Sequence, residues 1–378
     1  METCEVLVVG GGPAGSTCAG ALVAAGLDVL LLDKESFPRQ KVCAGWITPA
    51  VFETLGLDAE EYRPGRVLQD IRRFRTGLMH GATVATDYGA TVSYGIRRAE
   101  FDQYLLQRSH VHRQFGEAVT TLQRQDDWWL INKHIRARLL VGAGGHFCPV
   151  AQLLGARIGH EKVVASQAAE WAMSPAEEQQ CRIQPDTPVL YFCQDMKGYG
   201  WLFRKGKYLN IGLGRKDAGN IVRHTKDFCA FIEQQAGLQD GFPARLQGHA
   251  YRLYAGEGRR HCFGDGAILI GDAAGVACPD SGEGILPAIE SALLASETIL
   301  AAKGEYSYAN LESYAVRLGS HFGSEHPHVS SLPAFSRLSC FLGTKLLSNS
   351  WFARHIVLDR CFLHTDRKIL HADYYRHG

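Results

Sequence analysis

The 378 residues include 40 basic and 39 acidic side chains, which leaves a formal net charge of +1. A chain of this length predicts about two domains. The even charge balance argues against a nucleic-acid partner, because a basic binding face leaves an excess of positive charge. The eleven cysteines form no C-x-x-C pair, which is typical of reduced intracellular thiols rather than of a disulfide framework or a zinc site. We therefore expect no metal.

Targeting signals are also missing from the sequence. No run approaches the roughly 18 apolar residues of a membrane-spanning helix. The first apolar strand begins near residue 5, which leaves no room for a signal peptide before it. These observations predict a cytoplasmic location.

The chain begins with an apolar strand at 6–9, a glycine-rich turn and a helix of small residues, and a second apolar strand then ends at Asp33. Gly10 allows the tight turn, Gly12 allows a pyrophosphate to approach the backbone, and Gly15 allows helix and strand to pack closely. The helix start stabilises phosphate charge, and Asp33 can accept hydrogen bonds from ribose hydroxyls. A Gly-x-Gly-x-x-Gly motif in this context predicts a dinucleotide site.

The middle of the chain predicts more strands than helices. A helix is expected over 97–108, and strand-like alternation follows over 115–145. Further strands are expected at 189–193 and within 201–213, where Lys205-Gly206-Lys207 is typical of a β-hairpin. These segments predict an antiparallel sheet inserted between parts of the nucleotide domain.

A second glycine-rich turn follows about 260 residues after the first. A buried strand ends at Gly271 and Asp272, and a turn through Gly282 and Gly284 leads into a helix beginning near Ile285. This arrangement offers a carboxylate to a polyol, and it offers free backbone N–H groups to negative charge, such as that on a reduced flavin ring. A nicotinamide does not need such a second site, so the pair of turns favours FAD.

Four segments together resemble a known family. They are the N-terminal fingerprint, residues 38–45 (similar to R-x-K-x-C-G), residues 98–102 (similar to R-x-x-F-D), and the second glycine-rich turn. The chain resembles the geranylgeranyl reductase-like branch of FAD-dependent oxidoreductases with the p-hydroxybenzoate hydroxylase fold. A weaker fifth likeness is residues 198–203, similar to the reductases' Y-x-W-x-F segment.

The resemblance implies an α/β fold with interleaved domains. A Rossmann-like FAD-binding domain is expected from residues 1–65, 95–160 and 262–325, an antiparallel substrate-binding sheet domain from 66–94 and 161–261, and a C-terminal helical region from 326–378. Apolar residues at helical spacing over 331–364 predict a helical cap on the core, or alternatively a surface that contacts a membrane or a partner.

The resemblance also implies functional residues. Cys43 lies in the loop that approaches the flavin in this family, and it is a candidate catalytic residue; the alternative is a small apolar filler. Arg39 and Arg98 are expected to supply counter-charge for the diphosphate. The complete cofactor set is Gly10, Gly12, Pro13, Ala14, Gly15, Asp33, Lys34, Arg39, Ala44, Arg98, Val119, Gly271, Asp272, Gly282, Gly284 and Ile285.

Aromatic residues are the candidates for substrate contact. Tyr199, Trp201 and Phe203 alternate along one strand and share a face, and Trp46 follows the Cys43 loop. Arg204 replaces a proline of the family pattern and, if it pointed inward, would suit an anionic head group. Glu283 could donate a proton, although an exposed turn position is the favoured interpretation.

The favoured function is reduction of a C=C bond in a hydrophobic, prenyl or lipid-like substrate by hydride transfer from reduced FAD. The alternative is a flavin-dependent monooxygenase or halogenase acting on a hydrophobic or aromatic small molecule, and a third hypothesis is a non-catalytic redox protein. Nothing in the sequence resembles a second dinucleotide site, so electrons are expected from a transiently bound NAD(P)H or a separate reductase. The C-terminal region is a candidate for peripheral membrane contact.

Overall fold

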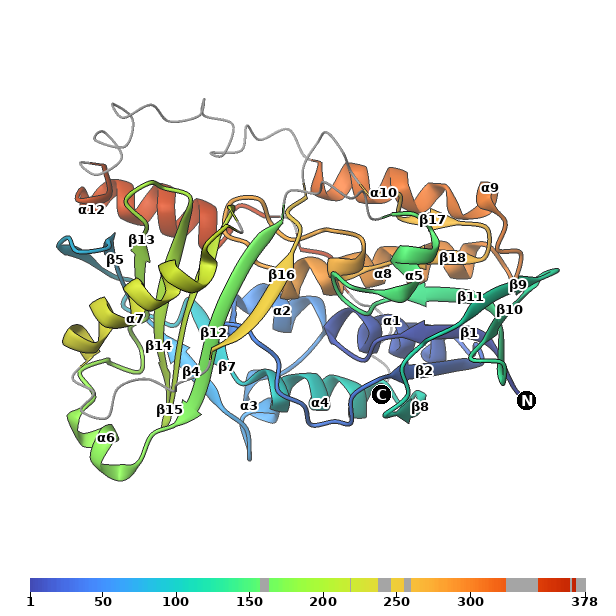
Figure 1. The fold of residues 1–378 in the computed structure, drawn as a ribbon, viewed down its shortest axis with the longest axis horizontal. Coiled ribbons are helices and arrows are strands. Elements are labelled where there is room, and N and C mark those ends of the chain that lie inside the picture. Colours follow the sequence, from blue (N-terminus) through green and yellow to red (C-terminus); the bar gives the residue numbers. More distant parts are fainter. Residues whose placement is uncertain are drawn as a thin grey trace.

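The computed structural model describes residues 1–156, 163–217, 219–236, 246–254, 260–323, 346–367 and 369–371. In these ranges the chain forms two large β-sheets and a small one, and the two large sheets lie toward opposite ends of the long axis (Figure 1). Each large sheet collects strands that are far apart in the sequence. The predicted interleaved α/β architecture is therefore confirmed.

The eight-stranded sheet is built around buried parallel strands. Its central strand β1 pairs in parallel with a strand on each side, Val6 lying opposite both Val29 and Leu139. A parallel sheet is covered on both faces, which explains the uninterrupted apolar run at its centre. In spatial order the strands are β17 (Phe263–Gly264), β18 (Ala267–Leu269), β11 (Ile135–Gly142), β1 (Glu2–Val9), β2 (Val29–Asp33) and β8 (His112–Phe115), with the hairpin of β9 (Leu122–Gln125) and β10 (Trp128–Ile131) joined to β11.

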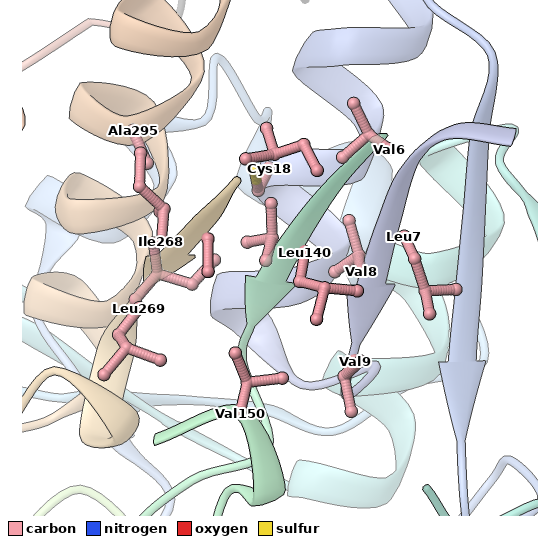
Figure 2. Packing of buried hydrophobic residues seen from close by; sticks show 14 of the residues in the cluster. Val6, Leu7, Val8, Val9, Cys18, Leu140, Val150, Ile268, Leu269 and Ala295 are labelled. Atoms are coloured by element: carbon pink, nitrogen blue, oxygen red, sulfur yellow. The ribbon is translucent and has the colours of Figure 1, made fainter. Parts of the chain in front are cut away.

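Two helices that follow the glycine-rich turns pack directly against each other. Helix α1 (Pro13–Ala24) is buried along its first ten residues, because it contacts both the sheet and α8 (Ile285–Ala301). Small side chains allow this approach: Ser296 Oγ lies 3.5 Å from Cys18 Sγ. Figure 2 shows Cys18 among the aliphatic side chains of the sheet. The other helices of this half are α4 (Arg98–Arg108), α5 (Pro149–Leu153), α9 (Tyr308–Leu311) and α10 (Ser313–Phe322).

The seven-stranded sheet is antiparallel except for one parallel pair, β13 with β5. The predicted hairpin at 205–207 is confirmed, since it joins β14 and β15. Helix α7 (Ile221–Ala236) covers one face, where the Phe228 ring occupies the space that a Cβ at Gly200 would need. The strand order is β16 (Gln247–Tyr251), β12 (Val164–Ala172), β15 (Tyr208–Arg215), β14 (Gly198–Lys205), β13 (Val189–Phe192), β5 (Arg73–Leu78) and β6 (Thr83–Asp87).

A small three-stranded sheet connects the two halves. It consists of β3 (Trp46–Ile47), β7 (Ser93–Ile96) and β4 (Leu68–Ile71). Lys205, at the end of β14, is fully buried and donates hydrogen bonds to the carbonyls of Ile96 (2.8 Å) and Ala44 (3.0 Å). The short helices near this junction and beside the large sheet are α2 (Pro49–Thr54), α3 (Ala59–Tyr62) and α6 (Pro175–Gln180).

The C-terminal segment lies on the seven-stranded sheet. Helix α12 (Ser350–Phe352) continues into the π-helical segment η3 (Ala353–Phe362), and Tyr88 donates a 2.5 Å hydrogen bond to Asp359. Of the region predicted to be helical, residues 331–345 lie outside the described residues. None of the helices in the described ranges is both long enough and apolar enough to cross a bilayer.

A substitution at Gly15 tests how much the close packing at the first turn contributes to stability. A Cβ at Gly15 would lie 1.8 Å from the Gly10 carbonyl oxygen, whereas a Cβ at Gly219 would meet no atom within 4 Å. We expect Gly15→Ala to lower the free energy of unfolding by about 3 kcal/mol, and Gly219→Ala to change it by less than about 0.5 kcal/mol. Chemical denaturation measures both, and equal stabilities would contradict the prediction.

Candidate functional site

A cavity of about 690 Å³ lies where the two halves meet. On one side it is lined by residues at the carboxyl ends of β1, β2, β11 and β18, including Asp33 and Gly271. On the other side it is lined by residues of the seven-stranded sheet, including Tyr199 and His249. Parallel α/β sheets bind ligands outside the carboxyl ends of their strands, so this cavity is the candidate site.

The first glycine-rich turn forms one end of the cavity. Gly10 has a φ of +113°, and a Cβ there would lie 2.5 Å from the Ala143 oxygen. Gly12 is different, because a Cβ there would meet only the Arg39 guanidinium, at 3.5 Å. Gly12 is also the N-cap of α1 and no side chain caps it. The space beside Gly12 and the uncapped helix start fit a pyrophosphate.

Asp33 is held in a fixed orientation at the same end. It is 8% exposed, and its two carboxylate oxygens accept backbone hydrogen bonds from Gly11 (2.6 Å) and Glu35 (2.9 Å). A carboxylate has further lone pairs, so Asp33 can still accept from a ribose hydroxyl. Lys34 and Val119 also line this end of the cavity.

Two arginines share one buried carboxylate. Arg98 donates to both oxygens of Asp102 (2.8 and 2.9 Å), and Arg39 lies 3.3 Å from the same group. Burial alone would lower the pKa of Arg98, but Asp102 and Cys43 outweigh it and raise that pKa above its ordinary value. Two positive charges against one negative charge leave an excess that suits a diphosphate.

The second glycine-rich turn forms the other part of the cavity wall. Asp272 lies 3.4 Å from His249 Nε2, and His249 Nδ1 lies 3.3 Å from Lys41 Nζ. Burial alone would raise the pKa of Asp272, but His249 and Lys41 outweigh it and hold that pKa below its usual value. Burial lowers the pKa of Lys41. Gly271, Gly282, Gly284 and Ile285 line the cavity beside this chain of polar groups.

Aromatic side chains enclose the far end of the cavity, which we call the aromatic chamber: Trp46, Tyr199, Trp201 and Phe362. The Phe362 ring stacks on Trp46 with a centroid distance of 5.3 Å, and it meets the edge of Tyr199 at 5.2 Å. The Tyr199 hydroxyl donates to the Ser281 carbonyl (2.5 Å). The chamber therefore offers an apolar surface that continues directly from the second glycine-rich turn.

Most of the predicted site residues line this one cavity, including Cys43 and Ala44 from the loop before β3. Three of the residues considered, Gly15, Phe203 and Arg204, do not line it. Gly15 packs below the first turn against Gly10. Phe203 lies behind the wall, 2% exposed, with its ring 6.4 Å from that of Trp46. Arg204 lies 3.5 Å from Glu178 and donates to the Gly206 carbonyl, so it does not face the cavity.

Glu283 corrects an expectation from the sequence. The favoured interpretation placed it in an exposed turn, but its side chain is 11% exposed and lines the cavity. Its position between two glycines of the second turn was a usable signal for a functional acid. Its burial follows from the tertiary structure, because the C-terminal segment covers the turn and brings His364 to 3.4 Å from it.

Other residues of the cavity wall were not predicted. Lys41 and His249 belong to the polar chain beside Asp272, and Phe362 belongs to the aromatic chamber. Lys41 lies in a segment that already carried the family resemblance, so a signal existed. His249 and Phe362 follow no motif, and only the packing of the chain places them in the site.

A family model agrees with this site. The model described as "FAD binding domain" matches residues 3–318. The chain belongs to this family. FAD is therefore the cofactor of this protein, and the predicted resemblance to geranylgeranyl reductase-like flavoproteins is confirmed by the relatives that follow.

Two curated relatives cover most of the chain. A protein of Methanocaldococcus jannaschii named digeranylgeranylglycerophospholipid reductase is 26% identical over 335 residues, which cover 83% of this chain and 81% of the relative. A protein of Mycobacterium tuberculosis named menaquinone reductase is 29% identical over 334 residues, which cover 79% and 77%. The chain is an FAD-dependent oxidoreductase of the geranylgeranyl reductase type.

Solved structures share the fold. A geranylgeranyl bacteriochlorophyll reductase-like protein of Thermoplasma acidophilum superposes with a TM-score of 0.78 at 19% identity, covering 97% of this chain and 98% of its own. A halogenase, PltM, in complex with FAD has a TM-score of 0.65 at 17% identity, covering 85% and 74%. The fold is thus common to reductases and to halogenases.

Gly12→Val tests whether the space beside the first turn receives the cofactor. Gly12 has a φ of −73°, which suits any L-residue, and its Cβ position is open in the protein. We expect Gly12→Val to lower the affinity for FAD at least about tenfold by filling the pyrophosphate site, while the melting temperature of the apoprotein stays unchanged. Fluorescence titration and thermal denaturation measure these quantities, with Gly219→Val as the surface control. Unchanged affinity for FAD would contradict the assignment.

Proposed function

We propose that the protein reduces a carbon–carbon double bond of a hydrophobic, prenyl or lipid-like substrate. The observation that carries this proposal is the aromatic chamber, which opens onto the second glycine-rich turn within one cavity. The names of the curated relatives, a digeranylgeranylglycerophospholipid reductase and a menaquinone reductase, support the same substrate class. When bound and reduced, FAD supplies the hydride.

The residues of the first turn and its neighbours would hold the adenosine diphosphate part of the cofactor. The start of α1 at Gly12 to Ala14 would hold the phosphates, and Asp33 would accept from the ribose, with Lys34 and Val119 beside it in the cavity wall. Arg39 and Arg98 supply positive charge. Asp272, held by His249, would accept from the ribityl chain, and the backbone of Gly282, Gly284 and Ile285 would hold the flavin ring.

The Cys43 loop would position flavin and substrate relative to each other. Gly45 N–H donates to Cys43 Sγ (3.3 Å), and Asn210 donates to the Cys43 carbonyl (2.9 Å). These bonds hold the loop against the seven-stranded sheet that carries the chamber. Trp46, Tyr199 and Trp201 then exclude water from the substrate, which protects a reduced flavin from side reactions.

The electrons that reduce the flavin, like the substrate, would come from another molecule. We infer that a transiently bound NAD(P)H or a reductase partner reduces the flavin. The proposed membrane contact of the C-terminal region has some support in the exposure of Leu346 (45%) and Trp351 (63%). A cytoplasmic location remains a prediction.

Anaerobic stopped-flow spectroscopy separates the two candidate chemistries. We expect the dithionite-reduced holoenzyme to be oxidised rapidly by a geranylgeranylated glycerophospholipid in detergent micelles, and only slowly by oxygen, without an intermediate. Rapid reaction with oxygen through an absorbing oxygenated flavin would instead favour the monooxygenase or halogenase alternative. Slow reoxidation with no turnover of any lipid would favour a non-catalytic redox protein.

Phe362→Leu tests the chamber. Phe362 is 6% exposed, and its stacking on Trp46 would be lost in the variant. We expect KM for the lipid to rise about tenfold, which corresponds to an aromatic contact of about 1.4 kcal/mol, with unchanged affinity for FAD. Phe231→Leu is the matched control, because Phe231 lies on α7, packs on Tyr191 and does not line the cavity. An equal effect of both substitutions on KM would reject the chamber as the substrate site.

A further inference from the structure

Glu283 is a buried acid in the wall of the cavity. Both of its carboxylate oxygens are closed off from solvent, and neither forms a hydrogen bond with any of the described residues. Its neighbour Ser281 accepts the hydrogen bond of Tyr199, so Glu283 lies beside the aromatic chamber. Buried polar groups normally have hydrogen-bond partners, and an acid left without one at a ligand cavity calls for a functional reason.

His364 is the basic group that faces Glu283. Its Nε2 atom lies 3.4 Å from a Glu283 oxygen, 3.4 Å from Ser281 Oγ and 3.5 Å from Cys278 Sγ. His364 follows the C-terminal η3 segment and has a φ of +50°, a conformation that histidine adopts more readily than most residues. The backbone conformation at His364 thus places its imidazole over the second glycine-rich turn.

Two other nearby charges, Glu290 and Arg367, balance each other. Glu290, one helical turn into α8, is paired with Arg367 and lies 3.2 Å from His321. Arg367 is therefore neutralised by Glu290 rather than by Glu283. The titratable and charged groups around Glu283 are Tyr199, Cys278, Asp280, Glu290, His364 and Arg367.

The protonation of this pair follows from its surroundings. Burial raises the pKa of the Glu283 carboxyl group to about 7. His364 acts in the opposite direction, but its effect is too small to restore the ordinary pKa of a glutamate. Burial likewise lowers the pKa of His364, against the effect of Glu283. Near neutral pH a carboxylic acid with such a pKa holds its proton and can also release it, which is the condition for efficient general acid catalysis.

The proposed reaction requires such an acid. An isolated alkene is electron-rich and accepts a hydride only as a proton adds to the neighbouring carbon. The aromatic chamber is lined by apolar rings, so an acid of the cavity wall is the expected source of the proton. Asp272, the other acid beside the second turn, is held below its usual pKa and is ionised. Tyr199 has a pKa well above its usual value and its proton is engaged with Ser281.

We propose that Glu283 is the proton donor of the reduction and that His364 is the positioning residue through which Glu283 regains its proton; this inference rests on the proposed function. One alkene carbon would receive the hydride, with its two electrons, that bound and reduced FAD supplies. The other carbon receives the proton of the Glu283 carboxyl group, so that two C–H bonds replace the π bond. The Glu283 carboxylate then takes a proton from His364, which takes one from water.

The first test is infrared difference spectroscopy of the apoprotein during a pH titration. We expect the carbonyl band of a protonated carboxyl group to disappear as the pH rises through about 7, and to be absent in Glu283→Gln. In His364→Gln the transition should stay near pH 7, because the lowered pKa of His364 leaves its imidazole largely uncharged where Glu283 titrates. Absence of this band in the wild type would overturn the assignment, independently of any activity.

The second test is oxidation of the dithionite-reduced holoenzyme by the geranylgeranylated glycerophospholipid. In the wild type the rate should fall as the pH rises through about 7, since the donor must be protonated. Glu283→Gln should bind FAD normally, react about 100-fold more slowly or worse, and lose this pH dependence. Glu283→Asp should restore part of the rate. His364→Gln should keep the pH dependence of the first turnover and slow the later turnovers, in which Glu283 has to regain its proton.

Glu297→Gln is the matched control. Glu297 lies on α8 at the protein surface, where it pairs with Arg317, and we expect wild-type rates and pH dependence from the variant. A Glu283→Gln enzyme with the wild-type rate and pH dependence would overturn the proton-donor assignment alone. A wild-type enzyme that the lipid does not oxidise would reject the proposed function and this assignment together.

Discussion

The site depends on the contact between α1 and α8. Each helix begins at a glycine-rich turn, and the two turns form one cavity only because the helices pack side by side. Small residues make this approach possible: Cys18 meets Ser296 in the middle, and a Cβ at Gly271 would lie 3.1 Å from the Ala14 Cβ. A larger side chain at this contact would separate the part of the cavity that suits phosphates from the part that suits a flavin ring.

The seven-stranded sheet is held to this base by a buried charge network. Lys205, at the end of β14, donates to the carbonyls of Ala44 and Ile96 and pairs with Glu170. Burial alone would raise the pKa of Glu170, but Lys205 outweighs it and keeps that pKa below its usual value. Breaking such a pair leaves an uncompensated buried charge. The network therefore holds the Cys43 loop, the small sheet and the chamber in one arrangement.

The C-terminal segment completes the cavity from a third direction. It contributes Phe362 to the chamber and His364 to the surroundings of Glu283, although these residues are about 80 positions from the second turn. The chain shares its fold with halogenases and reductases, and the part that matches the FAD-binding family model, residues 3–318, ends before the C-terminal segment. The chamber and the buried acid, in contrast, depend on contacts made by residues 350–364. The residues proposed for substrate contact and proton supply are thus separate from those proposed to hold the cofactor.

The sequence by itself was sufficient for the features that depend on local backbone geometry. The turns at Gly10 and Gly282, the hairpin at 205–207 and the strand ending at Asp33 follow from positive φ values, close approaches and apolar runs, which a short segment determines alone. The fold class followed because these segments occur in a recognisable order. The surroundings of individual side chains could not be predicted from the sequence, because they depend on residues that are distant in the chain.

Only the tertiary structure decided which side chains face the cavity. Tyr199 and Phe203 share one face of a strand, yet only Tyr199 reaches the cavity, because Trp46 lies in front of Phe203. Glu283 has the sequence context of an exposed turn and becomes a buried acid because the C-terminal segment covers it. Burial and electrostatic coupling arise from long-range packing, and no local pattern at Glu283 or His364 encodes them.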